Sequence, residues 1–296
     1  MEIKKIGEMG LIEKIWDIFG RKNEDEDVHF YDSGNEYILL AMDTINEGFH
    51  FERWWDPQLI GKFLVDINLS DIASKNGTPR EMMVSMSFPR DLREEWVSAL
   101  VNGMKSEMEK YQVDFSGGDM KESKKISLTG LVIGKVEKGK EFRRNSARVG
   151  DNVYITGKIG KNERAIYDYY KKKDGKYREI LDITPRLDAL NSMRKHIVTS
   201  CIDNSDGIYK SLYLISSLSS VRVKIEGDVC DMESSEEERR RIYSIGGDYE
   251  LIFTSPEEIG EFQKLGVVQE GRGVVDIGAG SINTEGFNHF KSTYHK

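Results

Sequence analysis

The sequence predicts a mixed α/β protein made of two domains. Its 296 residues exceed the usual size of a single domain. Apolar segments of strand composition alternate with segments of helical periodicity in both halves of the chain. Several strand segments end in an aspartate, and α/β proteins place ligand-binding groups at strand ends. We therefore expect polar side chains to meet at the strand ends of two α/β units.

In the first half, helices are expected to alternate with strands. Leu11, Ile15 and Phe19 recur at helical spacing, and Pro57 suits the first turn of a later helix. The expected elements are a helix over 7–19, strands over 28–31 and 37–42, a helix over 57–76, a strand over 81–89, a helix over 91–110, a strand running from 113 into the glycines at 117–118, and a strand over 126–136.

A second α/β unit is expected from residue 152 onward. The expected elements are a strand over 153–157, helices near 161–172 and 185–195, a strand over 197–202, a helix over 205–218, a strand over 221–226, an exposed helix over 234–241 and a strand over 248–253. The basic segment 142–151 precedes this unit and is expected at a domain junction. We therefore predict an N-terminal domain over 1–139 and a C-terminal domain over 140–296.

Composition narrows the function classes. The net charge of -8 argues against a general nucleic-acid or anionic-membrane surface. The two cysteines, Cys201 and Cys230, form no CxxC pair, which excludes a cysteine zinc site and fits a reducing cytoplasm. The N-terminal stretch lacks the apolar core of a signal peptide, and no apolar run approaches the ~20 residues that cross a membrane. We expect a cytoplasmic protein that binds neither nucleic acid nor membrane.

The most informative stretch lies at 199–207, where a predicted strand leads into a predicted helix. It holds Asp203 and Asp206, with a serine between them and Gly207 after them. Such residues commonly cap a helix, because their oxygens accept otherwise unpaired backbone N–H groups. The alternative is a hard-metal site, since Mg²⁺ takes carboxylates together with substrate phosphates.

Other segments strengthen the metal interpretation. Acids also stand at strand ends or on a helix face in four more places, Asp27, Asp43, Asp71 and Asp119. Clustered carboxylates repel one another unless cations neutralise them, and Mg²⁺ with a nucleoside triphosphate is the usual reason for such a cluster. The chain has neither a P-loop motif nor the protein-kinase motif set.

Three further features have both a functional and a structural interpretation. The pair Gly117-Gly118 would let the backbone approach a phosphate, or would form an ordinary turn. The basic segment 142–151 offers an arginine fork for a phosphate, or an exposed linker. His50, between two phenylalanines, would contact a ligand or pack in the core.

As an ordered set, these segments resemble the thiamine-monophosphate kinases. That family shares a superfamily with aminoimidazole ribonucleotide synthetase and selenophosphate synthetase. The stretch Asp43-Thr44 through Glu47-Gly48-Phe49-His50-Phe51 distinguishes this branch from its relatives. The other matching stretches are Gly7-Glu8 with Leu11-Ile12, Glu26-Asp27-Val28, Asn68 to Ala73, Gly117-Gly118-Asp119, Arg143 to Asp151, Ile202 to Gly207, Asp248 to Leu251, and Gly286 to Phe290.

The resemblance implies phosphorylation of thiamine monophosphate by ATP, giving thiamine diphosphate and ADP. It also implies a homodimer in which N-terminal strands of two subunits form a β-barrel, each followed by a C-terminal α/β sandwich domain. By motif, several Mg²⁺ ions would be held by Asp27, Asp43, Thr44, Asp71, Asp119, Asp203 and Asp206, of which Asp43, Asp119 and Asp206 are the expected catalytic residues. ATP would be contacted by Gly118, Asp119, Arg144 and Ser205, and thiamine phosphate by His50, Asp248 and Phe287.

The chain departs from the family pattern at two positions. Glu26 precedes Asp27 where the family has two aspartates, and Gly247 stands where the family has a glutamate, so Glu250 is an alternative substrate contact to Asp248. The competing functions are a sister ATP-dependent synthetase acting on a purine intermediate, a metal-dependent phosphatase, and a non-catalytic sensor of Mg-nucleotide or thiamine phosphate.

Overall fold

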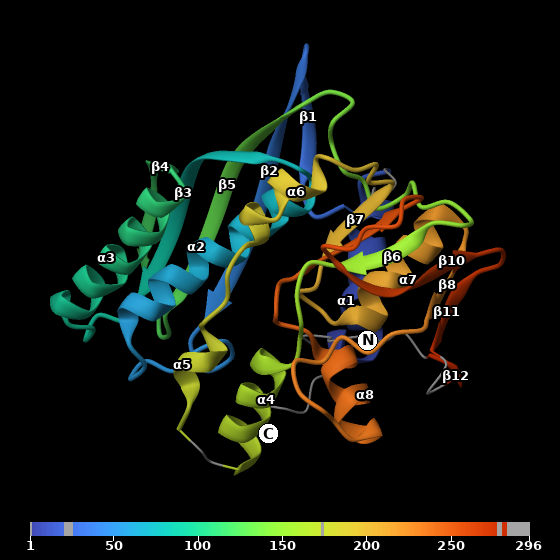
Figure 1. Ribbon diagram of the computed structural model, residues 1–296. Helices are drawn as coiled ribbons and strands as arrows, with labels where there is room; N and C mark the ends of the chain where they lie inside the picture. The colour runs from blue at the N-terminus through green and yellow to red at the C-terminus, as the bar shows by residue number, and fades with distance from the viewer. Residues whose placement is uncertain (1, 21–25, 173–174, 277–279, 283–296) are drawn as a thin grey trace.

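The computed structural model describes residues 2–20, 26–172, 175–276 and 280–282. It contains two sheets, which confirms the predicted mixed α/β class (Figure 1). The five-stranded sheet has the order β1-β2-β5-β3-β4, and the seven-stranded sheet has the order β12-β11-β8-β10-β6-β9-β7. The first sheet ends with β5 and the second begins with β6, so residues 138–151 connect the two.

In the first half, the elements follow the predicted order. Their bounds are α1 Ile3–Ile18, β1 His29–Ser33, β2 Glu36–Asn46, α2 Pro57–Ser74, β3 Thr78–Phe88, α3 Glu94–Lys110, β4 Asp114–Glu122 and β5 Ser127–Glu137. Within α1, the backbone at Gly7 is not helical, with φ 76° and ψ 175°, so the regular helix follows this residue. A turn was one expectation for the two glycines at 117–118. Both lie inside β4 instead, because this strand continues to Glu122.

In the second half, short elements surround the larger sheet. Their bounds are β6 Asn152–Ile155, α4 Lys161–Tyr167, a π-helical turn Asp168–Lys172, α5 Tyr177–Ile180, a 3₁₀ turn Arg186–Asp188, α6 Leu190–Met193, β7 Ser200–Asp203, α7 Ile208–Ser219, β8 Arg222–Ile225, α8 Glu236–Ile245, β9 Leu251–Ser255, β10 Gln263–Gln269, β11 Gly273–Asp276 and β12 Gly280–Ser281. The helix expected over 185–195 is wrong, since only a 3₁₀ turn and one α-helical turn form there. Among the described elements, α5, β10, β11 and β12 were not predicted.

Local sequence determines both ends of α2. Pro57 occupies the first turn, and Asp56 caps it by accepting a 3.1 Å hydrogen bond from the backbone N–H of Gln58. After the helix, Asn76 adopts a left-handed φ of 59°, and the N–H of Gly77 donates to the carbonyl of Ile72.

Burial places α2 at the centre of the molecule (Figure 1). Thirteen of its 18 residues are buried. The helix packs against β2 and β5 of the first sheet, against α3, and against β7 of the second sheet. A helix that is buried over most of its surface has no broad solvent-facing polar stripe. Several of its polar residues therefore lie inside the protein, which is how α2 delivers an acid to the interior.

The face of the first sheet opposite α2 and α3 carries exposed apolar side chains. Met42, Leu131 and Met83 lie in register across β2, β5 and β3. Met42 is 67% exposed and Met83 is 39% exposed. The neighbouring row runs through Thr44, Thr129, Ser85 and Asp119.

Among the helices of the described residues, none has the length and apolar character that a membrane span requires.

Candidate active site

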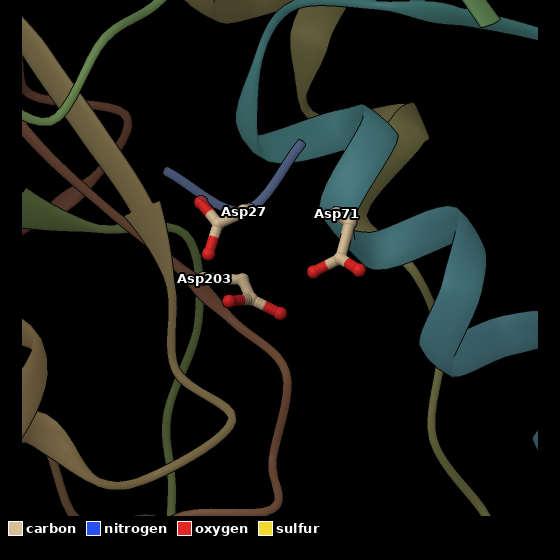
Figure 2. A group of neighbouring side chains, drawn as sticks. All are labelled: Asp27, Asp71 and Asp203. Atoms are coloured by element: carbon tan, nitrogen blue, oxygen red, sulfur yellow. The ribbon is translucent and has the colours of Figure 1, made fainter. Parts of the chain in front are cut away.

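Three aspartates from distant segments meet beside α2. Asp27 precedes β1, Asp71 lies on α2, and Asp203 ends β7. One carboxylate oxygen from each lies within 4.8 Å of the others. Figure 2 shows the three side chains turned toward one another. The sequence predicted all three residues, and the fold brings them together.

Cations of the protein neutralise Asp27. Its Oδ2 accepts hydrogen bonds from Ser74 Oγ at 2.9 Å and Arg144 Nε at 3.3 Å, and Lys75 Nζ lies 2.7 Å away. Arg144 Nη2 donates to the other oxygen. Burial alone would raise the pKa of Asp27, but the charges of Arg144 and Lys75 lower it to about 2. Asp27 is therefore ionised at neutral pH.

The other acids lack comparable compensation. Burial, followed by the charge of Asp27, raises the pKa of Asp203 to about 7. Burial and the charges of Asp206 and Asp27 raise the pKa of Asp43 to about 6, and burial with neighbouring acids raises the pKa of Asp71 well above its usual range. A divalent cation would relieve this repulsion, and the all-oxygen donor set suits a hard ion. Asp27, Asp71 and Asp203 would hold it.

A cavity of about 290 Å³ opens between the two halves beside this cluster. Its polar wall includes Asp43, Thr44, Asp71, Ser205 and Asp206. Its apolar wall includes Ile45, Phe49, Phe63, Ile67, Ile166, Tyr170 and Ile180. A ligand with an anionic end and a ring system fits such a division, provided that cations mediate between its anion and the acids.

His50 also lines the cavity. Its Nδ1 accepts a 3.0 Å hydrogen bond from the backbone N–H of Asn46. Its ring lies 4.9 Å from that of Phe49, at an interplanar angle of 61°. Both contacts fix the imidazole at the rim of the cavity, so the ligand-contacting interpretation of His50 agrees with its position.

Gly118 and Asp119 lie outside this cavity. A Cβ at Gly118 would lie 1.9 Å from the carbonyl oxygen of Val84, so the glycine is needed for β4 to approach β3. Asp119 is exposed and pairs with Lys121 at 2.8 Å. Two strands separate β4 from β2, which carries Asp43. Within one chain, Asp119 therefore lies apart from Asp43 and Asp71.

Asp248 has a structural partner. Its carboxylate accepts backbone hydrogen bonds from Gly160 at 3.0 Å and Asn162 at 3.1 Å, at the start of α4. Burial raises the pKa of Asp248 to about 6, although these two hydrogen bonds act against the shift. The carboxylate caps a helix and does not line the cavity.

Glu250, the alternative substrate contact, is also engaged. Both of its oxygens accept from Arg186 Nη1, at 2.8 and 2.9 Å, and Thr156 Oγ1 donates to it as well. Phe287, the third expected thiamine phosphate contact, lies outside the described residues.

Glu8 and Tyr249 also line the cavity, and the sequence analysis gave neither of them a role in the site. Glu8 follows the non-helical Gly7 and lines the cavity. Tyr249 has a positive φ of 54°, which is rare for a bulky residue, and its ring lies 6.5 Å from that of Phe63. The glycine pair at 246–247 was the only local indication of this turn.

Comparisons with known proteins agree with this geometry. Residues 24–136 match the family model of the AIR synthase related protein, N-terminal domain. A thiamine-monophosphate kinase of Aquifex aeolicus is 27% identical over 98% of this chain and 100% of its own length. The solved structure of AaThiL complexed with AMPPCP and TMP superposes with a TM-score of 0.86, at 26% identity over 98% of this chain and 99% of that one. Hydrogenase maturation protein HypE, at 15% identity and a TM-score of 0.69, shares the fold.

The two-sheet fold and its acid-lined cavity are thus those of a protein similar to the AIR synthase related proteins. Among these, the chain is similar over nearly its whole length to thiamine-monophosphate kinase.

Proposed function

We propose that this protein transfers the γ-phosphoryl group of ATP to thiamine monophosphate, forming thiamine diphosphate and ADP. The observation that carries the proposal is the cavity between the two halves, which has four acids near one wall and apolar rings on the other. It occurs in a chain similar throughout to a structure described as a complex with AMPPCP and TMP. The polar wall suits phosphates with their cations, and the apolar wall suits the rings of the acceptor.

The acceptor group determines what the protein must supply. A phosphate monoester has a second pKa of about 6, so it is largely ionised at neutral pH and needs no strong general base. The obstacle is repulsion between two anions. When bound, Mg²⁺ supplies neutralisation of the phosphate oxygens and alignment for in-line attack. The residues proposed to hold several such ions are Asp27, Asp43, Thr44, Asp71, Asp119, Asp203 and Asp206.

The protein's own groups orient the two substrates. Arg144, held against Asp27, and Ser205, on the cavity wall, are proposed to contact ATP, together with Gly118. His50 is proposed to contact thiamine phosphate from the rim, and Phe287 from the C-terminal segment. Asp248 supports the cavity from behind by holding the start of α4. Positioning and charge stabilisation then supply most of the rate enhancement.

A homodimer is part of the proposal. The exposed row Met42, Leu131 and Met83 is an apolar sheet face of the kind that a second subunit covers. Two such faces packed together would close the intersubunit barrel. Asp119 lies on this face, in register with Ser85, so it would reach an active site only across the subunit interface. A mixed dimer of one Asp119→Asn chain and one Asp206→Asn chain tests this arrangement through recovery of activity in one of its two sites.

We also propose a cytoplasmic location, which is supported by two buried cysteines that form no disulfide.

The decisive test of function is ADP release from Mg·ATP, with and without thiamine monophosphate, with the product identified by mass. Acceptor-dependent ADP together with thiamine diphosphate would establish the kinase. An ATP hydrolysis rate that does not depend on thiamine monophosphate, or no turnover by folded dimer, would contradict the kinase proposal. Either result would favour a sister synthetase, a phosphatase or a sensor.

A further inference from the structure

A buried lysine stands next to the acid cluster. Lys75 follows the last residue of α2 and is 0% exposed. Its Nζ lies 2.7 Å from Glu26 Oε2, 2.7 Å from Asp27 Oδ2 and 3.3 Å from the carbonyl oxygen of Cys201. Burying an ammonium group is costly unless its charge is paired and its hydrogen bonds are made. Here both conditions are met by the two acids that precede β1.

Protein donors already occupy most of the acceptor sites of these two acids. Asp27 Oδ2 is approached by Ser74, Lys75 and Arg144, and Arg144 Nη2 donates to Oδ1. Glu26 Oε1 accepts from the backbone N–H of Arg144 at 3.1 Å, and its other oxygen faces Lys75. A carboxylate offers about four lone-pair sites in total. A divalent ion bridging Glu26 and Asp27 would have to displace the ammonium of Lys75.

The charges lead to the same conclusion. Glu26 and Asp27 carry two negative charges, and Lys75 and Arg144 carry two positive charges, so this quartet is neutral. Asp71 and Asp203 have no such partners among these cations at hydrogen-bond distance, and Asp203 accepts from the neutral Ser70. The net negative charge that attracts divalent ions therefore lies on the side of Asp71 and Asp203.

We propose that Lys75 is a resident cation of the metal centre, and that it replaces one divalent ion. The ammonium group of Lys75 neutralises Glu26, so Glu26 is not a metal ligand. The same ammonium group occupies Oδ2 of Asp27, so Asp27 binds a metal ion only on the side that faces Asp71 and Asp203. Lys75 is thus a positioning residue. The inference rests on the metal centre of the proposed function, but not on the identity of the phosphoryl acceptor.

The test counts Mn²⁺ ions bound to the full-length protein by equilibrium dialysis and by the EPR signal of free Mn²⁺, without nucleotide or thiamine monophosphate. Lys75→Met is expected to bind one more Mn²⁺ per chain than the wild type. Glu26→Gln is expected to bind the wild-type number of Mn²⁺ ions, with a modestly weaker Kd because Lys75 then loses one of its two neutralising acids. The double variant Lys75→Met/Glu26→Gln restores neutrality and is the matched control, expected to bind the wild-type number.

An equal count in Lys75→Met and the wild type would overturn the proposal. So would the loss of one bound Mn²⁺ ion in Glu26→Gln, because that result would make Glu26 a ligand. If Lys75→Met does not fold, the Glu26→Gln variant decides alone. If the wild-type protein binds no Mn²⁺, the metal centre does not exist and the proposal is wrong. A failed kinase assay with the expected Mn²⁺ counts would leave the proposal standing.

Discussion

Ser70 on α2 donates a 2.8 Å hydrogen bond from its Oγ to Oδ2 of Asp203, and both residues are buried. The two residues lie in different halves of the chain, 133 positions apart. The contact lets the central helix of the first half orient an acid at the end of β7. It also stabilises the ionised form of Asp203, because a hydroxyl donor favours the carboxylate.

Replacing Ser70 with alanine is expected to weaken both stability and metal binding. Loss of a hydrogen bond to a buried carboxylate costs about 1–3 kcal/mol of unfolding free energy. The Mg²⁺ concentration that gives half-maximal ADP release should rise, since protonation of Asp203 then competes more strongly with the metal. Urea unfolding and Mg²⁺ titration measure the two effects. Ser98→Ala is the control, because Ser98 makes a similar bond to Glu94 on the exposed side of α3. Equal behaviour of the two variants would contradict the prediction.

Asp206→Asn should abolish turnover with little loss of stability. Asp206 lines the cavity and pairs with Lys210 one helical turn away, at 2.5 Å. Such an i,i+4 pair contributes about 0.3–0.5 kcal/mol, whereas loss of a metal ligand should lower kcat by roughly 100-fold or more. Steady-state kinetics and thermal unfolding measure the two effects.

Asp168→Asn is a matched control for Asp206→Asn, because Asp168 forms the same i,i+4 pair with Lys172 outside the cavity. Near-normal turnover of Asp206→Asn at low Mg²⁺ would remove Asp206 from the metal ligands.

Glu250→Gln is expected to destabilise the protein without changing the KM for thiamine monophosphate. Its carboxylate holds Arg186 at 2.8 Å, and loss of this partly buried, charge-assisted contact costs about 1–3 kcal/mol. Chemical denaturation measures the loss, and KM is determined at a temperature where the variant is folded. Glu258→Gln, which breaks an exposed pair with Lys264, should change stability by less than about 0.5 kcal/mol. A large rise in KM for Glu250→Gln would instead make Glu250 a substrate contact.

The raised pKa of Asp66 leads us to expect that the unfolding free energy depends on pH, independently of the active site. Asp66 is buried between α2 and α3 beside Glu107, and burial together with the charge of Glu107 raises its pKa to about 8. The unfolded value is about 3.9. Between about pH 4 and pH 8, the folded protein keeps a proton that the unfolded chain releases. The unfolding free energy contributed by this group therefore falls as pH rises through that window.

Asp66→Asn removes the titrating group while keeping a neutral donor toward Glu107. The variant should gain stability relative to the wild type between pH 5 and pH 8.5, by ~1 kcal/mol or more. Urea midpoints at three pH values test this expectation, with the exposed Glu95→Gln as a control for net charge. Parallel pH profiles for wild type and Asp66→Asn would show that Asp66 is ionised in the folded protein.

Elements with strong local signals were predictable from the sequence. Pro57 and the Asn76-Gly77 pair bracket α2, which was expected over 57–76 and spans Pro57–Ser74. Aspartates at strand ends identified the acid cluster, because hard cations require oxygen ligands. The acid cluster could be named from the sequence, but its geometry depends on three segments that only the fold brings together.

The errors arose where long-range contacts determine local conformation. A turn at Gly117-Gly118 was a reasonable expectation, but Gly118 is needed for close pairing with Val84 on another strand. For Asp248, which was expected to contact the substrate, the sequence did not indicate the backbone N–H groups at the start of α4, 86 positions away, that bind its carboxylate. Neither partner can be identified from neighbouring residues, because both contacts depend on how the second half folds.

The enclosure of α2 also determines the timescale on which the site can open. Amide hydrogens in an element covered on all sides exchange with solvent only when the whole domain unfolds. Asp71 is carried by this helix, whereas His50 and Asp206 follow strand ends and lie on connecting segments. Deuterium uptake should therefore be slowest around Asp71 and faster around His50 and Asp206. We therefore expect Asp71 to mark a fixed wall of the cavity, and the segments that carry His50 and Asp206 to move when ligands enter and leave.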